Sequence, residues 1–298
     1  MIERIEIDLW PGVAPGSAGL DLVEQVDERS TDCTAFHDRA ISAITRPRMV
    51  VFKPAQPDGS ALLLAPGGGY QRVVWDKEGV EVAEWLAGLG MTVAVLIYRL
   101  PGEGHADGHL VPLQDAQRAL RLLRQQAAAW GLDQTRIGAM GFSAGGHVIA
   151  SLATRFDEAS YRPLDAIDAH SARPDFVALG YPVISMDPAI AHAGSRSKLL
   201  GAHVDDTAFA ARASAELQVR ADTPESFILL PDDDRAVPPE NSIRYYLALR
   251  AAGVRAELHV FRDGGHGFGI RLADGPVREW TTLFAAWLRH TGRLRAAR

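Results

Sequence analysis

Residues 136–147 read RIGAMGFSAGGH, and this stretch decides the fold. The apolar and glycine residues up to Met140 predict a buried strand, and the small residues from Ala144 onward predict a helix. Between them, residues 141–145 match the pattern GxSxG, in which Ser143 lies on a sharp turn with its hydroxyl exposed. Glycine flanks the serine because such a turn leaves no room for larger side chains. The alternative interpretation is a glycine-rich helix start at which Ser143 is only an N-cap.

Strand-like runs alternate with helix-like segments from residue 61 onward. The strand candidates are 61–65, 91–98, 136–140, 176–181, 227–230 and 256–261, and the helix candidates are 78–88, 111–129, 144–154, 239–252 and 277–290. This alternation is what a mostly parallel sheet flanked by helices requires, and near-continuous Val, Leu and Ile imply strands buried on both faces. The sequence therefore predicts an α/β fold.

The less regular parts of the chain predict additions to this sheet within a single domain over residues 1–298. In the N-terminal region, residues 1–60, Ala40 to Phe52 predict one or two antiparallel edge strands. Residues 185–223 contain no clear strand and predict a small helical insertion or minimal lid.

Composition excludes several classes of protein. The 298 residues include 31 Lys and Arg and 37 Asp and Glu, which gives a net charge of −6. Nucleic-acid binders usually have an excess of basic residues, so this class of protein is disfavoured. The longest apolar stretch, Met91 to Tyr98, is too short to cross a membrane. The opening MIERIEIDLWPG has no apolar signal-peptide core, so we expect a cytoplasmic protein. Cys33 is the single cysteine, and we expect it to be a packing residue.

A nucleophilic Ser143 needs a base and an orienting acid later in the chain. His266 follows the last strand candidate in the loop RDGGHGFG, and Asp234 follows the preceding strand candidate in LLPDDDRAVPP. All three residues thus lie at carboxyl ends of predicted parallel strands, the edge at which α/β sheets bind ligands. We expect Asp234 to be the acid, with Asp233 and Asp187 as alternatives.

The segment PGGGY at residues 66–70 follows the first strand candidate and offers backbone amides for a developing oxyanion. We expect the donors to be the amides of Gly68, Gly69 and Ala144. A phosphate-binding loop is disfavoured because no GxxxxGK[ST] pattern is present.

Two aromatic residues near this segment, Tyr70 and Trp75, either line the substrate site, as an acyl-pocket wall or a stacking surface for a sugar ring, or pack in the core. His147 lies one helical turn after the serine, and we expect it to pack behind the site. His105 and His109 lie in a glycine-rich loop that we expect to be solvated. We therefore expect neither a metal nor a cofactor.

These motifs resemble the α/β-hydrolase superfamily and, within it, the acetyl-xylan-esterase-like group of carbohydrate esterases. The resemblance covers most of the chain and rests on LWPGVAPGSAG, PGGGY, EGVEVAEWLAGLGMTVAVLIYRLP, GFSAGGH, VPPENS and ELHVFRDGGHGFG. It implies an α/β-hydrolase fold and a serine esterase that removes acetyl groups from carbohydrate through Ser143, Asp234 and His266. One departure is that Leu230 and Pro231 stand where relatives often have histidine and a small residue.

The residues and the resemblance together predict hydrolysis of short-chain esters, such as acetylated xylo-oligosaccharides, through an acyl-enzyme. The expected partner is a small-molecule ester, not nucleic acid or a membrane, and the sequence leaves a homo-oligomer open. One alternative is a peptidase or a dienelactone-type lactone hydrolase on the same fold. Another is a non-catalytic binding module that has kept the scaffold.

Overall fold

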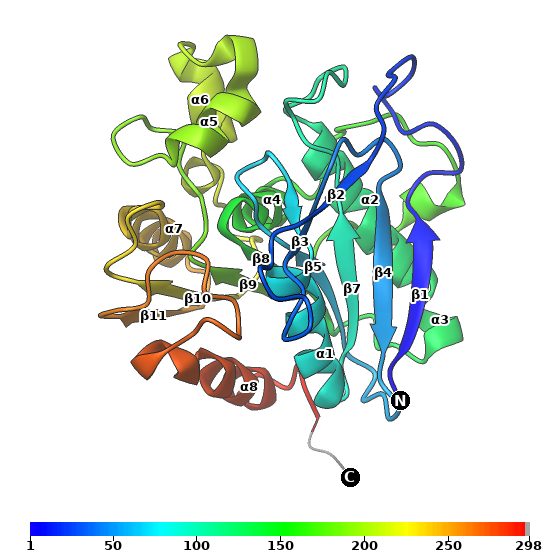
Figure 1. Ribbon diagram of the computed structural model, residues 1–298, viewed down its shortest axis with the longest axis vertical. Coiled ribbons are helices and arrows are strands. Elements are labelled where there is room, and N and C mark those ends of the chain that lie inside the picture. The colour runs from blue at the N-terminus through cyan, green and yellow to red at the C-terminus, as the bar shows by residue number, and fades with distance from the viewer. Residues whose placement is uncertain (296–298) are drawn as a thin grey trace.

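The computed structural model describes residues 1–295, and its strands form one large sheet and one small sheet (Figure 1). The large sheet has eight strands in the order β1-β4-β7-β5-β8-β9-β10-β11. Their bounds are β1 (Glu3–Asp8), β4 (Arg48–Lys53), β5 (Ala61–Ala65), β7 (Thr92–Ile97), β8 (Ile137–Phe142), β9 (Val177–Gly180), β10 (Ser226–Pro231) and β11 (Ala256–Phe261). From β7 to β11 all neighbours pair in parallel, whereas β4 pairs antiparallel with β1 and β7. The predicted, mostly parallel sheet is confirmed.

Helices cover both faces of this sheet and bury its central strands. They are α1 (Glu81–Gly88), α2 (Val111–Gln125), α3 (Ala127–Trp130), α4 (Ser143–Thr154), α5 (Ala193–Leu200), α6 (Thr207–Ala213), α7 (Glu240–Ala251) and α8 (Trp280–His290). Shorter turns are the π-helix η1 (Asp76–Val80) and the 3₁₀ turns η2 (Ala166–Ala169), η3 (Gly201–His203), η4 (Ala215–Leu217) and η5 (Gly275–Glu279). Every residue of β5, β7, β8 and β10 is buried, as their apolar runs predict.

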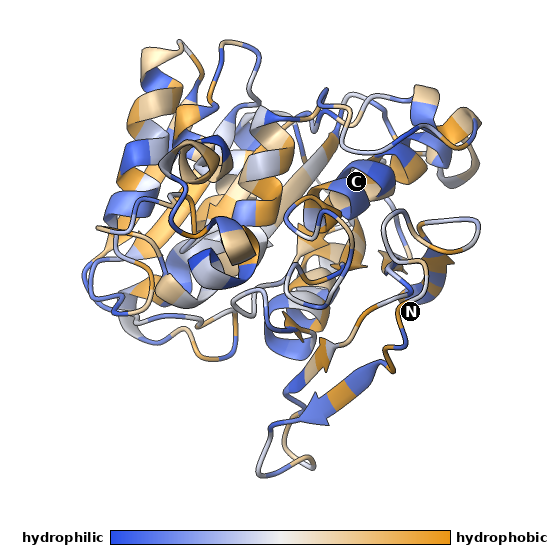
Figure 2. Ribbon diagram, turned by 90° about the horizontal axis from the view of Figure 1, so that it is seen from above, coloured by the Kyte–Doolittle hydropathy of each residue, from blue (hydrophilic) through white to orange (hydrophobic). Residues whose placement is uncertain are grey.

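Two hydrophobic cores lie on opposite faces of the sheet. Leu120 of α2 and Val148 of α4 belong to one core, and Leu86 of α1 and Trp280 of α8 belong to the other. Figure 2 shows the apolar residues gathered on the central strands and on the helix surfaces that cover them. The segment predicted as one helix over 111–129 is in fact α2 followed by the short α3.

The N-terminal region differs from the prediction of edge strands between Ala40 and Phe52. The strand β3 (Arg39–Ser42) pairs with β2 (Gln25–Glu28) and β6 (Val73–Val74) in a separate three-stranded sheet. The edge of the large sheet is β1, so β4 is an internal strand. The reason is that Ile5 and Ile7 alternate with charged residues, which gives β1 one face for the core and one for water.

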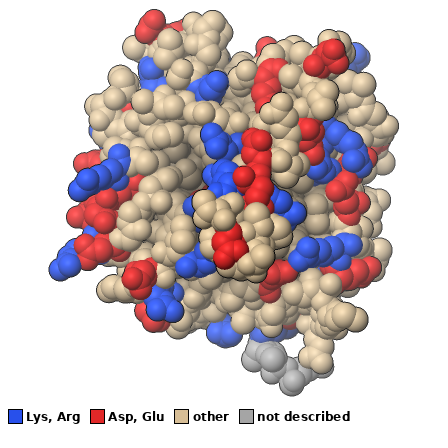
Figure 3. Space-filling view, viewed as in Figure 1, with Lys and Arg blue, Asp and Glu red and all other residues tan. Residues whose placement is uncertain are grey.

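Residues 185–223 contain the helices α5 and α6 and the turns η3 and η4, joined by loops, and no strand. Figure 1 shows their helices α5 and α6 beyond the carboxyl ends of the parallel strands, the end to which the β7 arrow points. No helix within residues 1–295 has the length and apolar character needed to cross a membrane. On the face in Figure 3, basic and acidic side chains are interspersed.

Candidate active site

The tight turn between β8 and α4 holds the backbone of Ser143 in a left-handed conformation. The serine has φ of +52°, in the left-handed region that side chains other than glycine rarely adopt. A Cβ added at Gly141 would overlap the backbone of Gly145, and a Cβ added at Gly145 would overlap the carbonyl of Ala65. Both glycines of the GxSxG pattern are therefore required by sterics, as the sequence predicts.

Three side chains from three loops meet at this turn. The Oγ atom of Ser143 lies 2.8 Å from Nε2 of His266, and Nδ1 of His266 lies 2.6 Å from Oδ2 of Asp234. The other carboxylate oxygen of Asp234 accepts the backbone N–H groups of Ala236 and Val237 at 2.8 and 2.9 Å. The loops after β8, β10 and β11 thus bring together a hydroxyl, a carboxylate and an imidazole.

The two alternative acids lie in other contacts. Asp233 accepts the N–H of Gly265 through Oδ1, so it supports the loop that carries the histidine. Asp187 forms an exposed ion pair with Arg244 at 3.0 Å. Neither carboxylate is hydrogen-bonded to the imidazole.

Electrostatics fix the proton arrangement in this group. Burial alone would raise the pKa of Asp234, but the hydrogen bond and charge of His266 and the two backbone amides outweigh it, so the pKa lies below its usual value. The ionised carboxylate can only accept, so Nδ1 of His266 carries the proton and donates it. Nε2 is then the acceptor for the hydroxyl of Ser143.

The PGGGY segment packs directly against the serine. A Cβ added at Gly67 would lie 2.8 Å from Cβ of Ser143. Within residues 1–295, the amides of Gly68 and Gly69 donate no hydrogen bond, and the amide of Ala144 is in the first turn of α4, where helices leave N–H groups unpaired. These three amides are free to bind an anionic oxygen.

Sequence reasoning missed Glu78, a carboxylate of η1 that is only 3% exposed. Its Oε2 accepts the N–H of Gly67 at 2.7 Å, and its Oε1 accepts the hydroxyl of Tyr181 at 3.0 Å. The same tyrosine oxygen accepts the N–H of Gly269 at 3.1 Å, and its ring packs edge-on against that of His266. Glu78 therefore connects the glycine segment to the histidine loop. The only sequence signal was its place in the EGVEV motif after PGGGY.

The structure places Tyr70 in a hydrophobic core, which favours the packing alternative. Its side chain is 1% exposed, and its hydroxyl donates to Nδ1 of His147 at 2.7 Å, so its ring is not available to stack on a sugar. Trp75 is half-buried and packs against residues of both hydrophobic cores, which agrees with the packing alternative.

His147 packs behind the serine, as expected, and it also connects two parts of the fold. Its Nε2–H donates to the carbonyl of Ala213 at the end of α6, at 2.7 Å. Burial lowers the pKa of His147 to about 4. The neutral imidazole therefore joins α4 to the helical segment 185–223.

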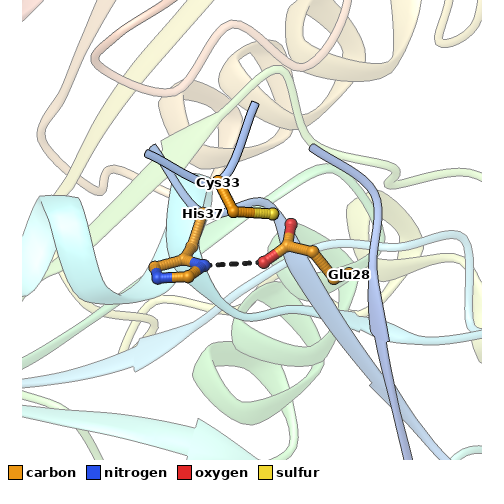
Figure 4. Close-up of side chains that lie close together, drawn as sticks. All are labelled: Glu28, Cys33 and His37. Atoms are coloured by element: carbon orange, nitrogen blue, oxygen red, sulfur yellow. Dashed lines mark hydrogen bonds and ion pairs between the residues drawn. The ribbon is translucent and has the colours of Figure 1, made fainter. Parts of the chain in front are cut away.

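The expectation that Cys33 packs in the core is wrong, because its side chain is exposed. It lies beside Glu28 and His37, and one ligand atom from each residue lies within 4.8 Å of the others (Figure 4). One carboxylate oxygen of Glu28 accepts the backbone N–H groups of Ser30 and Asp38, and the other lies 2.7 Å from Nδ1 of His37. These bonds explain the arrangement without an ion.

The two loop histidines have ordinary contacts. His105 is buried, contrary to the expectation of a solvated loop, and its Nδ1 lies 3.0 Å from Oγ of Ser17. The ring of His109 packs edge-on against Phe209.

The sequence of this chain matches a known protein family and known relatives. The family model BD-FAE matches residues 52–249. The chain belongs to the BD-FAE family. It is 36% identical over 226 residues to an acetylxylan esterase of Xylanibacter ruminicola, which covers 75% of this chain and 44% of that protein. It is 38% identical over 212 residues to endo-1,4-beta-xylanase B of Butyrivibrio fibrisolvens, which covers 70% of this chain and 32% of that protein. The chain thus spans less than half the length of these curated relatives.

Solved structures extend the likeness to nearly the whole BD-FAE chain. The acetyl ester-xyloside bifunctional hydrolase of Caldicellulosiruptor lactoaceticus is 33% identical, with a TM-score of 0.79 over 98% of this chain and 97% of that chain. Esterase 2 of Thermogutta terrifontis, solved phosphoramylated by tabun, is 25% identical, with a TM-score of 0.71 over 97% of this chain and 99% of that chain. The α/β-hydrolase fold and the resemblance to acetyl-xylan-esterase-like proteins are confirmed.

Proposed function

We propose that this BD-FAE protein is a serine carboxylic-ester hydrolase that removes acetyl groups from short acetylated xylo-oligosaccharides. The observation that carries the proposal is the hydrogen-bonded line from Ser143 through His266 to Asp234, with contacts of 2.8 and 2.6 Å. The substrate class is supported by relatives that are named an acetylxylan esterase and an acetyl ester-xyloside hydrolase.

In the first step, Oγ of Ser143 attacks the carbonyl carbon of the acetyl ester while Nε2 of His266 takes the hydroxyl proton. Asp234 keeps the imidazole oriented and stabilises its positive charge. The imidazolium then gives the proton to the departing sugar oxygen, which leaves an acetyl group on Ser143. In the second step, the same imidazole removes a proton from water as the water oxygen attacks the acetyl-serine. The imidazolium then returns this proton to Oγ of Ser143 as the bond from Oγ to the acetyl carbon breaks, and acetic acid leaves and ionises to acetate.

The tetrahedral intermediates carry a negative oxygen beside the glycine segment. The free amides of Gly68, Gly69 and Ala144 bind this oxygen, and each such donor lowers the barrier by about 3 kcal/mol. Gly67 is not a donor in this scheme because its N–H is held by Glu78.

The test is acetate release from acetylated xylo-oligosaccharides by the purified protein and by Ser143→Ala. A matched control is Ser197→Ala, an exposed serine on α5. We expect Ser143→Ala to lose activity by several orders of magnitude and Ser197→Ala to retain it. Equal rates in the two variants would exclude the mechanism. Faster turnover of a dipeptide anilide or a lactone would assign the site to a peptidase or lactonase instead.

A further inference from the structure

A polar cleft of about 320 Å³ opens beside the glycine segment. Its wall includes Gln25 of β2, Ser42 of β3, Gln71, Glu103 and Lys198 of α5. Its size is at the lower end of the range for small-molecule sites, which run from about 300 to 1,000 Å³. Five separate segments of the chain thus converge on a hollow in which polar side chains predominate.

The cleft adjoins the glycine segment of the proposed catalytic site through Tyr70 and Gln71. Tyr70 and Gln71, which line the cleft, directly follow the three-glycine segment, in which Gly67 packs on Ser143. A Cβ added at Gly69 would lie 4.0 Å from Nε2 of Gln71 and 3.7 Å from Cε1 of His192. The surface over Gly69 therefore lies between these two side chains.

His192 offers a free donor at this surface. Its Nδ1 accepts the backbone N–H of Ser195 at 3.2 Å, so the proton of the neutral ring is on Nε2. Burial and the nearby His266 lower the pKa of His192, which keeps the ring neutral. Within residues 1–295, Nε2 has no hydrogen-bond partner.

Two further side chains in the cleft have polar groups without protein partners. The side-chain amide of Gln71 forms no hydrogen bond, and Lys198 forms no ion pair, among the described residues. By contrast, both carboxylate oxygens of Glu103 accept backbone N–H groups, those of Ala43 and Ile44. The cleft therefore presents an amide and an ammonium group, next to an imidazole N–H.

We propose that this cleft is a saccharide subsite, in which Gln71, Lys198 and His192 bind hydroxyl groups of the sugar rings next to the acetylated one. The inference rests on the proposed esterase function for the identity of the saccharide. Neutral sugars present dense hydroxyl donors and acceptors, and these match the unpaired polar groups of the cleft.

The experiment compares the double variant Gln71→Ala/Lys198→Ala with Gln134→Ala, an exposed glutamine away from the cleft. For each protein, kcat/KM is measured on acetylated xylotetraose and on 4-nitrophenyl acetate. We expect kcat/KM on acetylated xylotetraose, divided by kcat/KM on 4-nitrophenyl acetate, to fall roughly tenfold in the double variant. The change should come mainly from a higher KM for the saccharide, because about two hydrogen bonds to it are lost. We expect Gln134→Ala to keep the wild-type ratio. An unchanged ratio in the double variant would overturn the subsite.

Binding without turnover separates this inference from the proposed function. Xylotetraose, without acetyl groups, is titrated by calorimetry into Ser143→Ala and into the same protein with Gln71→Ala and Lys198→Ala. We expect a roughly tenfold weaker dissociation constant with the cleft substitutions. Equal binding, or none to either protein, would overturn the subsite. Failure of the wild type to hydrolyse either ester would overturn the esterase proposal alone.

Discussion

Replacing Glu78 by glutamine tests whether a buried carboxylate holds the active-site loops together. In the structure it accepts two hydrogen bonds, from the N–H of Gly67 and the hydroxyl of Tyr181. Glutamine has the same shape but only one acceptor, so its NH₂ group must face one of these two donors. The variant loses one hydrogen bond to a charged group and strains the other. We expect the free energy of unfolding to fall by about 3 kcal/mol.

Glu78→Gln should also slow catalysis, because Gly67 directly precedes Gly68 and Gly69, whose unpaired amides are the proposed oxyanion donors. Displacement of one oxyanion donor costs on the order of 10²-fold in kcat. The assay is hydrolysis of 4-nitrophenyl acetate alongside urea unfolding, with Glu84→Gln as the control. Glu84 is an exposed glutamate of α1, and its change is expected to stay within about 0.5 kcal/mol. Wild-type kcat and wild-type stability in Glu78→Gln would refute this reasoning.

Three other substitutions follow from the site. Gly68→Ala should lower kcat/KM at least on the order of 10²-fold, because φ at Gly68 is +133° and the new Cβ would overlap the carbonyl of Arg72. The control Gly12→Ala should be neutral. Equal activity and equal melting temperature in the two variants would contradict this prediction. The folded-state pKa of His147, about 4, lies below its unfolded value. Acidification from about pH 6.5 to 4 should therefore lower the free energy of unfolding by about 3 kcal/mol. Urea unfolding of His147→Gln over the same pH range should lack this loss. Asp234→Asn should lower kcat by about 10⁴-fold, since an amide does not stabilise the imidazolium. The stability that the low pKa of Asp234 provides should be present above about pH 4 and disappear as pH falls further, and a parallel decline in the asparagine variant would argue against it.

The sequence predicts the central strands and the turn at Ser143 because short segments of the chain are enough to specify them. The apolar run at β5 requires burial on both faces, and the glycines beside Ser143 are required by the turn itself. The positions of His266 and Asp234 follow from one topological rule, since the carboxyl ends of parallel strands share an edge. Each of these inferences needs only a short segment and a general constraint.

Other features depend on partners that are distant in the sequence. Tyr70 packs in a hydrophobic core, where its hydroxyl bonds to His147, 77 residues away. Nothing near Tyr70 in the sequence distinguishes a buried tyrosine from an exposed one. Glu78 acquires its role from Tyr181, which lies 103 residues further along the chain. Cys33 is exposed because its segment joins β2 to β3 outside the large sheet, and the sequence did not reveal that small sheet.

The most direct test of the central claim is covalent labelling with a fluorophosphonate, followed by peptide mass spectrometry. If His266 activates Ser143, one adduct should form on Ser143, and its rate should fall by on the order of 10³-fold in His266→Ala. Labelling of Ser143 at the same rate without the imidazole, or no labelling at all, would contradict the account.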